Sequence, residues 1–380
     1  MKEFNISTVI CYGEGALKKL NEIVGKRVLI VCDAFIRKSD ILKKVVENLD
    51  KNSIFTYSEI IPDPTVEVVA KGLQILQKEN IDVIVAVGGG SSIDGAKAIA
   101  EYYRKLNGEV EKKLKFYAIP TTSGTGSEVT EYSVITNEKE NLKYALTSKE
   151  ILPDIAILDA ELVRSVPKSI TADTGMDVIT HAIEAYVSKE ATDFTDALAE
   201  KAFCLAIENL EKTYNNGENL KFREKMHSAS CLAGLAFNNA GLGLTHSLAH
   251  AIGGKLHIPH GKINAIILPY VIKFNSDIKN YSYSSEPTDI MIKYQKLAKL
   301  IGINVTNPIL GVNKLINYLF ELNKKIGIPS TLKELGKNPE VIKEMKNEIY
   351  LAVMKDVCTK TNPREITEDY IDSLLTEIIG

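Results

Sequence analysis

The chain has 380 residues, more than a single hydrophobic core usually supports, so two domains are expected. Its formal net charge is −3, and it shows no basic stripe interleaved with aromatic residues, which argues against a nucleic-acid partner. The first residues lack the apolar core of a signal peptide, and no apolar run reaches the roughly 18 residues of a membrane helix. Five scattered cysteines without a CxxC pair favour free thiols in a reducing cytoplasm.

The first part of the chain alternates short apolar runs with amphipathic patterns. Strands buried on both faces are expected at 26–32, 81–87, 115–119 and 155–158. A turn is expected at 60–65, and helices are expected at 41–49, 66–80 and 95–106. Strands that alternate with helices predict an α/β domain with a parallel sheet that is covered on both faces.

The pattern changes after about residue 160, where long helical periodicities replace the short apolar runs. We therefore expect an α/β domain over residues 1–163 and an all-α domain over residues 164–380. The helices expected in the second domain lie at 196–213, 222–237, 245–252, 290–301, 312–327, 339–357 and 366–379.

Two glycine-containing loops follow predicted strands. Residues 88–94 (GGGSSID) open a helix, where glycine lets backbone N–H groups approach a phosphate. Residues 121–128 (TTSGTGSE) offer hydroxyl groups to a nicotinamide ribose and its pyrophosphate. The alternative for the first loop is a tight structural turn in which Ser91 caps the helix, and the alternative for the second loop is an ordinary solvated loop. Asp33 suits an adenosine ribose and would repel a 2′-phosphate, which favours NAD over NADP; an exposed turn aspartate is the alternative.

Histidine is concentrated in one stretch, because residues 241–260 hold four of the six histidines, while Asp177 and His181 lie upstream. Asp177 and His181, like His246 and His250, are spaced i, i+4, which places each pair on one helix face. Carboxylate and neutral imidazole are usual ligands of divalent metals. We expect the two stretches to meet and hold one metal ion with ligands from two helices and a loop. Capped core histidines are the alternative, and spacing alone does not identify which histidines bind.

Five motifs give the chain a close resemblance to the iron-containing (group III) alcohol dehydrogenase family over essentially its whole length. They are PDPT at 62–65, GGGSSID at 88–94, PTTSGTGSEVT at 120–130, GMDVITHAIEAYVS at 175–188 and NNAGLGLTHSLAHAIGGKLHIPHG at 238–261. The resemblance implies a Rossmann-like N-terminal domain, a C-terminal helical domain and an active site in the cleft between them.

The resemblance also implies specific site residues. It assigns the metal to Asp177, His181, His246 and His260, and it places His250 beside the metal in substrate contact or proton passage. His257 and His227 fall outside the pattern and are interpreted as structural or exposed. The implied cofactor contacts are Asp33, Gly89, Gly90, Ser91, Asp94, Thr121, Thr122, Thr125 and Lys143. Asp63 departs from the asparagine of many relatives, and a carboxylate there would disfavour contact with cofactor phosphates.

The expected activity is reversible hydride transfer between NAD and a small primary alcohol or diol, yielding the aldehyde, with Fe²⁺ as the preferred metal and Zn²⁺ as the alternative. NADP is the less favoured cofactor. The resemblance suggests a homodimer or a larger homo-oligomer. The alternatives are a glycerol-dehydrogenase-like enzyme, a dehydroquinate-synthase-like lyase, and a non-catalytic protein that binds a nucleotide or a metal. The lyase needs a cluster of basic residues for its phosphorylated substrate. In the segments 175–186 and 241–258, which flank the expected site, Lys255 is the only lysine or arginine.

Overall fold

A computed structural model describes residues 3–108, 114–138, 142–278 and 286–380. Contacts within the chain group it into two compact units. The first comprises Met1–Ser165 and Glu218–Gly234, and the second comprises Val166–Gly217 and Leu235–Gly380. Among the described residues, no helix is both long enough and apolar enough to cross a membrane.

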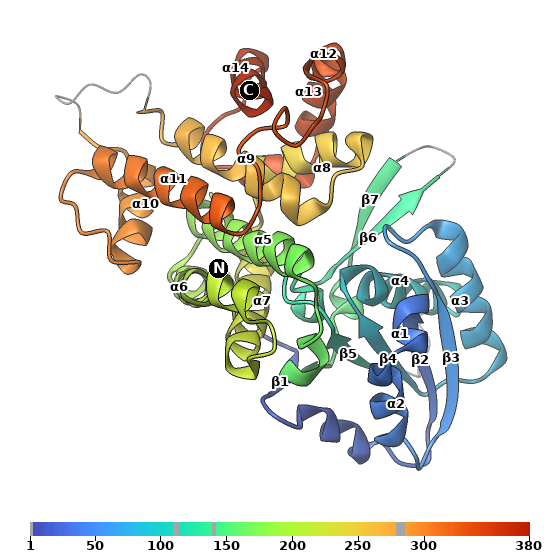
Figure 1. Cartoon of the computed structure of the whole chain (residues 1–380). Helices are drawn as coiled ribbons and strands as arrows, with labels where there is room; N and C mark the ends of the chain where they lie inside the picture. The colour runs from blue at the N-terminus through green and yellow to red at the C-terminus, as the bar shows by residue number, and fades with distance from the viewer. Residues whose placement is uncertain (1–2, 109–113, 139–141, 279–285) are drawn as a thin grey trace. The chain divides into compact units, whose positions relative to one another are not determined.

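The first unit is built on a six-stranded parallel sheet in the order β1-β8-β5-β4-β2-β3, as the alternating pattern predicts (Figure 1). The side chains of β2 alternate between two cores: Val28 and Ile30 point to one face, and Leu29 and Val31 point to the other. Because both faces are buried, the central strands are continuously apolar. The strands are β1 (Val9–Tyr12), β2 (Arg27–Asp33), β3 (Ser53–Ile60), β4 (Val83–Gly88), β5 (Lys115–Pro120) and β8 (Ile155–Leu158).

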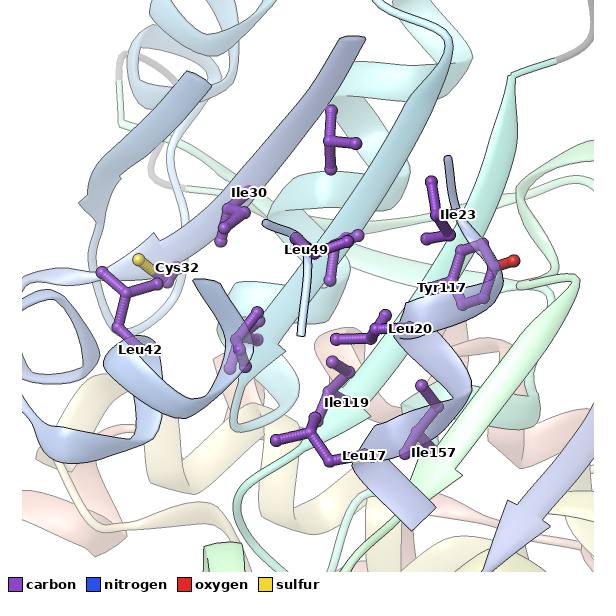
Figure 2. Close-up of a cluster of buried hydrophobic side chains, with 14 of the residues drawn as sticks. Leu17, Leu20, Ile23, Ile30, Cys32, Leu42, Leu49, Tyr117, Ile119 and Ile157 are labelled. Atoms are coloured by element: carbon purple, nitrogen blue, oxygen red, sulfur yellow. The ribbon is translucent and has the colours of Figure 1, made fainter. Parts of the chain in front are cut away.

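Helices cover both faces of this sheet. One core is completed by η1 (Ala16–Glu22), α1 (Ala34–Lys38) and α2 (Asp40–Glu47). Leucines of η1 and α2 and an isoleucine of α1 join Ile30, Ile119 and Ile157 in this buried cluster (Figure 2). The other core is completed by α3 (Val66–Lys78) and α4 (Gly90–Leu106). In the sheet, β2, β4 and β5 are neighbours, so their carboxyl ends lie side by side. All the predicted cofactor residues except Lys143 lie at these ends or in the segments that follow them.

Four strands of the first unit were not expected from the sequence. β1 is only four residues long and partly exposed, and β3 mixes polar and apolar residues, so neither forms a continuous apolar run. β6 (Tyr132–Asn137) and β7 (Leu142–Thr147) form a separate antiparallel hairpin, and Thr136 pairs with Lys143. The short elements η2 (Ser127–Val129), η3 (Lys149–Ile151) and η4 (Ala160–Val163) connect these strands.

The second unit consists of helices, as expected. At its centre lies α5 (Lys168–Val187), which is almost entirely buried and packs against α6 and α9. The predicted single helix over 339–357 is wrong, because α12 ends at Glu344 and a new helix, α13, begins at Lys346. The other helices are α6 (Asp193–Asn215), α8 (Leu244–Leu256), α9 (His260–Asn275), α10 (Asp289–Leu300), α11 (Pro308–Lys325), α12 (Pro339–Glu344), α13 (Lys346–Lys355), η6 (Val357–Thr361) and α14 (Glu368–Ile379).

One further helix, α7 (Leu220–Ala240), belongs to the first unit as far as Gly234 and to the second unit from Leu235. Its first part lies against the loop that follows β5, since a Cβ on Gly126 would come within 2.7 Å of Gly234 Cα.

Candidate functional site

One carboxylate and three imidazoles converge within the second unit. Asp177, His181, His246 and His260 each bring one ligand atom to within 4.8 Å of the others. Asp177 Oδ1 lies 3.8 Å from His246 Nε2 and 3.7 Å from His260 Nε2. Three of the four residues are buried, and His260 is exposed. The two histidine-bearing stretches therefore meet in space, and this donor set suits a divalent metal of borderline softness.

Three helices supply these residues. Asp177 and His181 lie one turn apart on α5, and His246 lies in the first turn of α8. The sequence placed His260 on a loop, but it is the first residue of α9. Gly261, the next residue, explains how α9 approaches α5 so closely, because a Cβ there would lie 2.1 Å from the carbonyl oxygen of Asp173.

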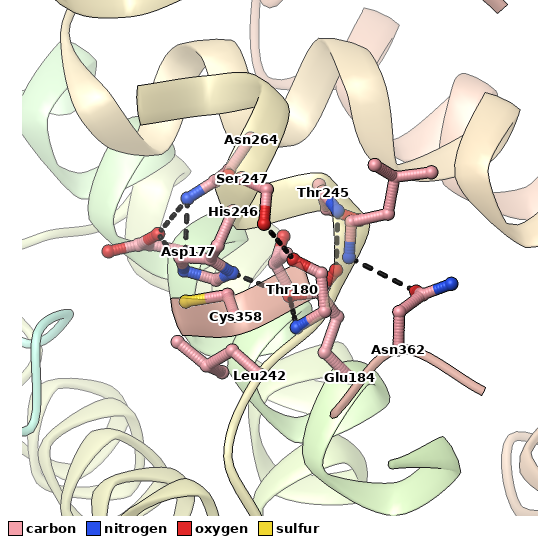
Figure 3. Close-up of polar contacts among 12 residues, drawn as sticks. Asp177, Thr180, Glu184, Leu242, Thr245, His246, Ser247, Asn264, Cys358 and Asn362 are labelled. Carbon is pink, nitrogen blue, oxygen red and sulfur yellow. Dashed lines mark hydrogen bonds and ion pairs between the residues drawn. The ribbon is translucent and has the colours of Figure 1, made fainter. Parts of the chain in front are cut away.

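Glu184, one turn after His181 on α5, orients His246. Its carboxyl group lies 2.6 Å from His246 Nδ1 and accepts the backbone N–H groups of Gly243 and Thr245 at the start of α8 (Figure 3). With Glu184 as the acceptor, Nδ1 carries the proton, so Nε2 presents its lone pair toward Asp177. Such a carboxylate–histidine pair is the usual outer support of a metal-ligating imidazole.

The protonation states also suit a cation. Burial lowers the pKa of His246 well below its ordinary value, and the neighbouring imidazoles add to this effect, so the ring is neutral. Burial alone would raise the pKa of Asp177, but His181, His260 and His246 outweigh it and hold the pKa below its usual range. The site therefore offers an ionised carboxylate and a neutral imidazole without prior proton loss.

Asn264 lies one turn after His260 on α9, and its side chain faces Asp177 and His246 (Figure 3). Its Nδ2 is 2.8 Å from Asp177 Oδ1, 3.2 Å from His246 Nε2 and 3.1 Å from His260 Nε2. One atom of Asn264 therefore lies close to a ligand atom of each of these three residues, so the three ligand atoms face a common region. The residues present therefore fit a metal ion bound by Asp177 and the imidazoles.

His250 borders the cluster on its exposed side. Its ring stacks on that of His260, with centroids 5.4 Å apart. Its Nδ1 lies 2.8 Å from Asp356 Oδ2, which leaves Nε2 for other partners. Burial alone would raise the pKa of Asp356, but the hydrogen bond and charge of His250 hold it below its ordinary value. Asp356 therefore fixes the tautomer and the orientation of His250.

His250, Asp356 and Cys358 also bring three possible ligand atoms within 4.8 Å of one another. Asp356 already accepts the backbone N–H of Cys358, and burial raises the pKa of the Cys358 thiol well above its ordinary value. We interpret this group as support for His250. His257 has φ 50° and ends α8, and its N–H donates to the carbonyl of Gly253.

In the first unit, the glycine loop (residues 88–92) and the threonine loop (residues 121–126) lie against each other. A Cβ on Gly90 would come within 2.7 Å of Thr125 Cγ2, and one on Gly89 within 3.4 Å of Thr122 Oγ1. Thr121 N–H donates to the carbonyl of Gly88. Gly89, not Ser91, is the N-cap of α4, and no side chain in the described part of the chain caps this helix end.

Asp33 joins these loops at the end of β2. Its Oδ1 accepts the N–H groups of Phe35 and Ile36, and its Oδ2 lies 3.4 Å from the hydroxyl of Ser92. Asp94 is placed differently, since its two oxygens accept the Ser127 hydroxyl at 2.5 Å and a backbone N–H at 3.0 Å. Its carboxylate therefore fixes the end of the threonine loop.

Lys143 is the remaining predicted cofactor contact, and Asp63 is the position at which a carboxylate was expected to disfavour contact with cofactor phosphates. Lys143 lies on β7, but its side chain is outside the described part of the structure. Asp63 is exposed and adopts φ 53° in the turn before α3.

Comparisons with known proteins show the family. The model described as iron-containing alcohol dehydrogenase matches residues 7–160, and the model of the C-terminal part of the Fe-containing alcohol dehydrogenase family matches residues 171–379. The chain belongs to the iron-containing alcohol dehydrogenase family. It is thus an oxidoreductase that acts on CH–OH groups, and its family combines a nicotinamide cofactor with a metal.

Two relatives and one solved structure match over all or nearly all of their lengths. The chain is 40% identical to 1-propanol dehydrogenase PduQ of Citrobacter freundii over 100% of both chains. It is 42% identical to the NADPH-dependent butanol dehydrogenase of Clostridium saccharobutylicum, over 97% of this chain and 96% of that protein. The crystal structure of a 1,3-propanediol oxidoreductase matches with a TM-score of 0.90 and 32% identity over 100% of both chains.

Three supporting residues, Glu184, Asn264 and Asp356, were missed by the sequence analysis. Glu184 and Asn264 stand three and four residues after the predicted ligands His181 and His260, so helical spacing was an available signal. Asp356 lies 106 residues from its partner His250, and no local pattern connects the two.

Proposed function

We propose that this enzyme interconverts a small primary alcohol or diol and its aldehyde, and that Asp177, His181, His246 and His260 hold its metal. The observation that supports this proposal most strongly is the convergence of one carboxylate and three imidazoles, whose ligand atoms all lie within 4.8 Å of one another. A bound divalent metal would supply Lewis-acid polarisation of the substrate oxygen, and a bound nicotinamide would accept or donate the hydride.

The chain's own residues would prepare the site for this chemistry. Glu184 and Asn264 hold the ligands in position. The exposed rings of His250 and His260 mark the open side, where a small substrate can enter, and a metal site that keeps an open side is typical of catalysis. With Nδ1 engaged by Asp356, His250 would take up or release the hydroxyl proton through Nε2.

We propose that the glycine loop, the threonine loop and Asp33 bind the cofactor, with NAD preferred over NADP. The uncapped first turn of α4 suits the pyrophosphate, and Asp33 would repel a 2′-phosphate. The preference needs a test, because one relative is an NADPH-dependent butanol dehydrogenase. If Asp33→Gly leaves the ratio of kcat/KM for NAD and NADP unchanged, the assigned role of Asp33 is wrong.

We propose iron as the native metal, in keeping with the iron-containing family to which the chain belongs. Zinc is the alternative, because a set of three imidazoles and one carboxylate binds either metal. The relatives named for 1-propanol and butanol support substrates of that size. We also propose a cytoplasmic homo-oligomer. The five free cysteines suit a reducing compartment, and β1 presents exposed Val9 and Tyr12 at the sheet edge, where a second copy can pair.

The test is elemental analysis of anaerobically purified protein, combined with a panel of C2–C4 alcohols, diols and aldehydes assayed with NAD(H) and NADP(H). We expect one metal per chain and turnover of a primary alcohol with steady NADH release. His260→Ala should lose both the metal and turnover, whereas full metal content in that variant would refute the ligand assignment.

A further inference from the structure

A buried histidine outside the metal cluster contacts the threonine loop. His227 lies on α7 and is 2% exposed. Its Nδ1 is 2.9 Å from the hydroxyl of Ser123, and its Nε2 has no hydrogen-bond partner in the described part of the chain. Burial lowers the pKa of His227 to about 4, so the ring is neutral near pH 7. The bond to Ser123 therefore joins a buried, neutral imidazole on α7 to the threonine loop.

The same face of α7 holds the loop at a second point. Ser230 and Gly234 follow His227 at i+3 and i+7, so the three residues share one face of the helix. A Cβ on Gly126 would lie 2.7 Å from Gly234 Cα and 3.3 Å from the carbonyl oxygen of Ser230. The backbone of Gly126 therefore lies directly on the helix, in a left-handed conformation with φ 62° that glycine accepts without strain.

The opposite side of the threonine loop faces the glycine loop, through Thr125 against Gly90 and Thr122 against Gly89. The end of the loop is fixed by the bond from Ser127 to Asp94. The threonine loop is thus enclosed between α7 and the glycine loop, and His227 provides the side-chain bond on the α7 side.

We infer that His227 is a positioning residue for the nicotinamide cofactor: by holding the Ser123 hydroxyl, it fixes the threonine loop in the conformation that binds the nucleotide. This inference rests on the proposed cofactor contacts of Thr121, Thr122 and Thr125. It assigns His227 no contact with substrate or metal, so its loss should affect nucleotide binding while sparing affinity for the alcohol.

The experiment compares Ser123→Ala and three variants of His227 by titrating each holoenzyme with NADH and following nucleotide fluorescence. An asparagine amide reaches the place of Nδ1, whereas a glutamine amide reaches that of Nε2. We therefore expect His227→Ala, His227→Gln and Ser123→Ala each to raise the Kd for NADH about fivefold, the effect of one neutral hydrogen bond, and His227→Asn to restore most of the affinity. The double variant should be no weaker than either single variant, and the KM for the alcohol should not change.

Thr8→Val is the matched control, because it removes a buried hydrogen bond, to the carbonyl of Pro153, elsewhere in the first unit. It should lower the melting temperature without changing the Kd. If wild-type protein binds NADH and His227→Ala binds it equally well, the inference is wrong while the proposed function stands. Equal losses in His227→Asn and His227→Gln would also overturn it. If His227→Ala does not fold, Ser123→Ala decides by the same criterion. Failure of the wild type to bind NADH or NAD would refute the proposed function itself.

Discussion

Replacing Gly261 with alanine should displace His260, a predicted metal ligand, although His260 itself is unchanged. Gly261 is the second residue of α9 and packs on α5 directly after His260. An added Cβ would lie 2.1 Å from the carbonyl oxygen of Asp173 and 2.6 Å from the carbonyl carbon. Since unstrained contacts of this kind need roughly 3.5 Å, relief of this contact requires α9 and α5 to separate by about 1.4 Å. Metal ligands tolerate deviations of only about 0.2 Å, so His260 should leave the common ligand position.

Metal content after exhaustive dialysis is the direct assay for this variant. We expect Gly261→Ala to retain little metal and to lose about 1–3 kcal/mol of stability through overpacking. Gly254→Ala is the matched control, because Gly254 lies in α8 close to the site and an added Cβ meets no described atom within 4 Å. That control should keep its metal and gain roughly 0.5–1 kcal/mol from better helix propensity. Equal metal retention in the two variants would refute the packing argument.

Three further predictions concern Glu184, Asp356 and His227. Glu184→Ala should weaken metal binding about 10–100-fold in a chelator competition, because His246 loses the acceptor of its Nδ1 proton, and wild-type affinity would contradict this role. Asp356→Asn should lower kcat by on the order of 100-fold without changing NADH affinity, because His250 loses its fixed tautomer; an unchanged kcat would show that the pair is not used in proton transfer. His227, whose pKa falls from 6.5 to about 4 on folding, binds more protons in the unfolded chain between these values, so it destabilises the fold progressively as pH falls from about 6.5 to 4. Over this pH range the free energy of unfolding should fall by about 3 kcal/mol because of His227. His227→Asn should remove this part of the pH dependence, and parallel plots of unfolding free energy against pH for wild type and variant would contradict the assigned pKa.

The elements that the sequence predicted best are those whose environment is uniform. β4 and the core of β2 are buried on both faces, so their residues form continuous apolar runs that few other structures explain. β1 has exposed ends at the sheet edge, and the hairpin of β6 and β7 carries mixed polar residues, so neither leaves a clear periodic signal. α9 was missed because its pattern is apolar almost all round and contains Pro269.

For the candidate metal centre, too, local sequence spacing predicted some features, and others depend on tertiary contacts. Spacing of four residues on a helix identified Asp177 with His181 and His246 with His250 as pairs, but it could not distinguish ligands from neighbours. That distinction depends on tertiary contacts. Asp356, distant in the sequence, engages Nδ1 of His250, and the close approach at Gly261 brings His260 to α5.

The most direct test of the central claim is metal titration of chelator-treated protein, followed by calorimetry and elemental analysis. The wild type should bind one Fe²⁺ or Zn²⁺ per chain, while Asp177→Asn and His260→Ala should each bind none at the same concentration, because both contribute to the single cluster of four ligand atoms. Stoichiometric binding that persists in both variants would show that the metal lies elsewhere and would contradict the account of the site.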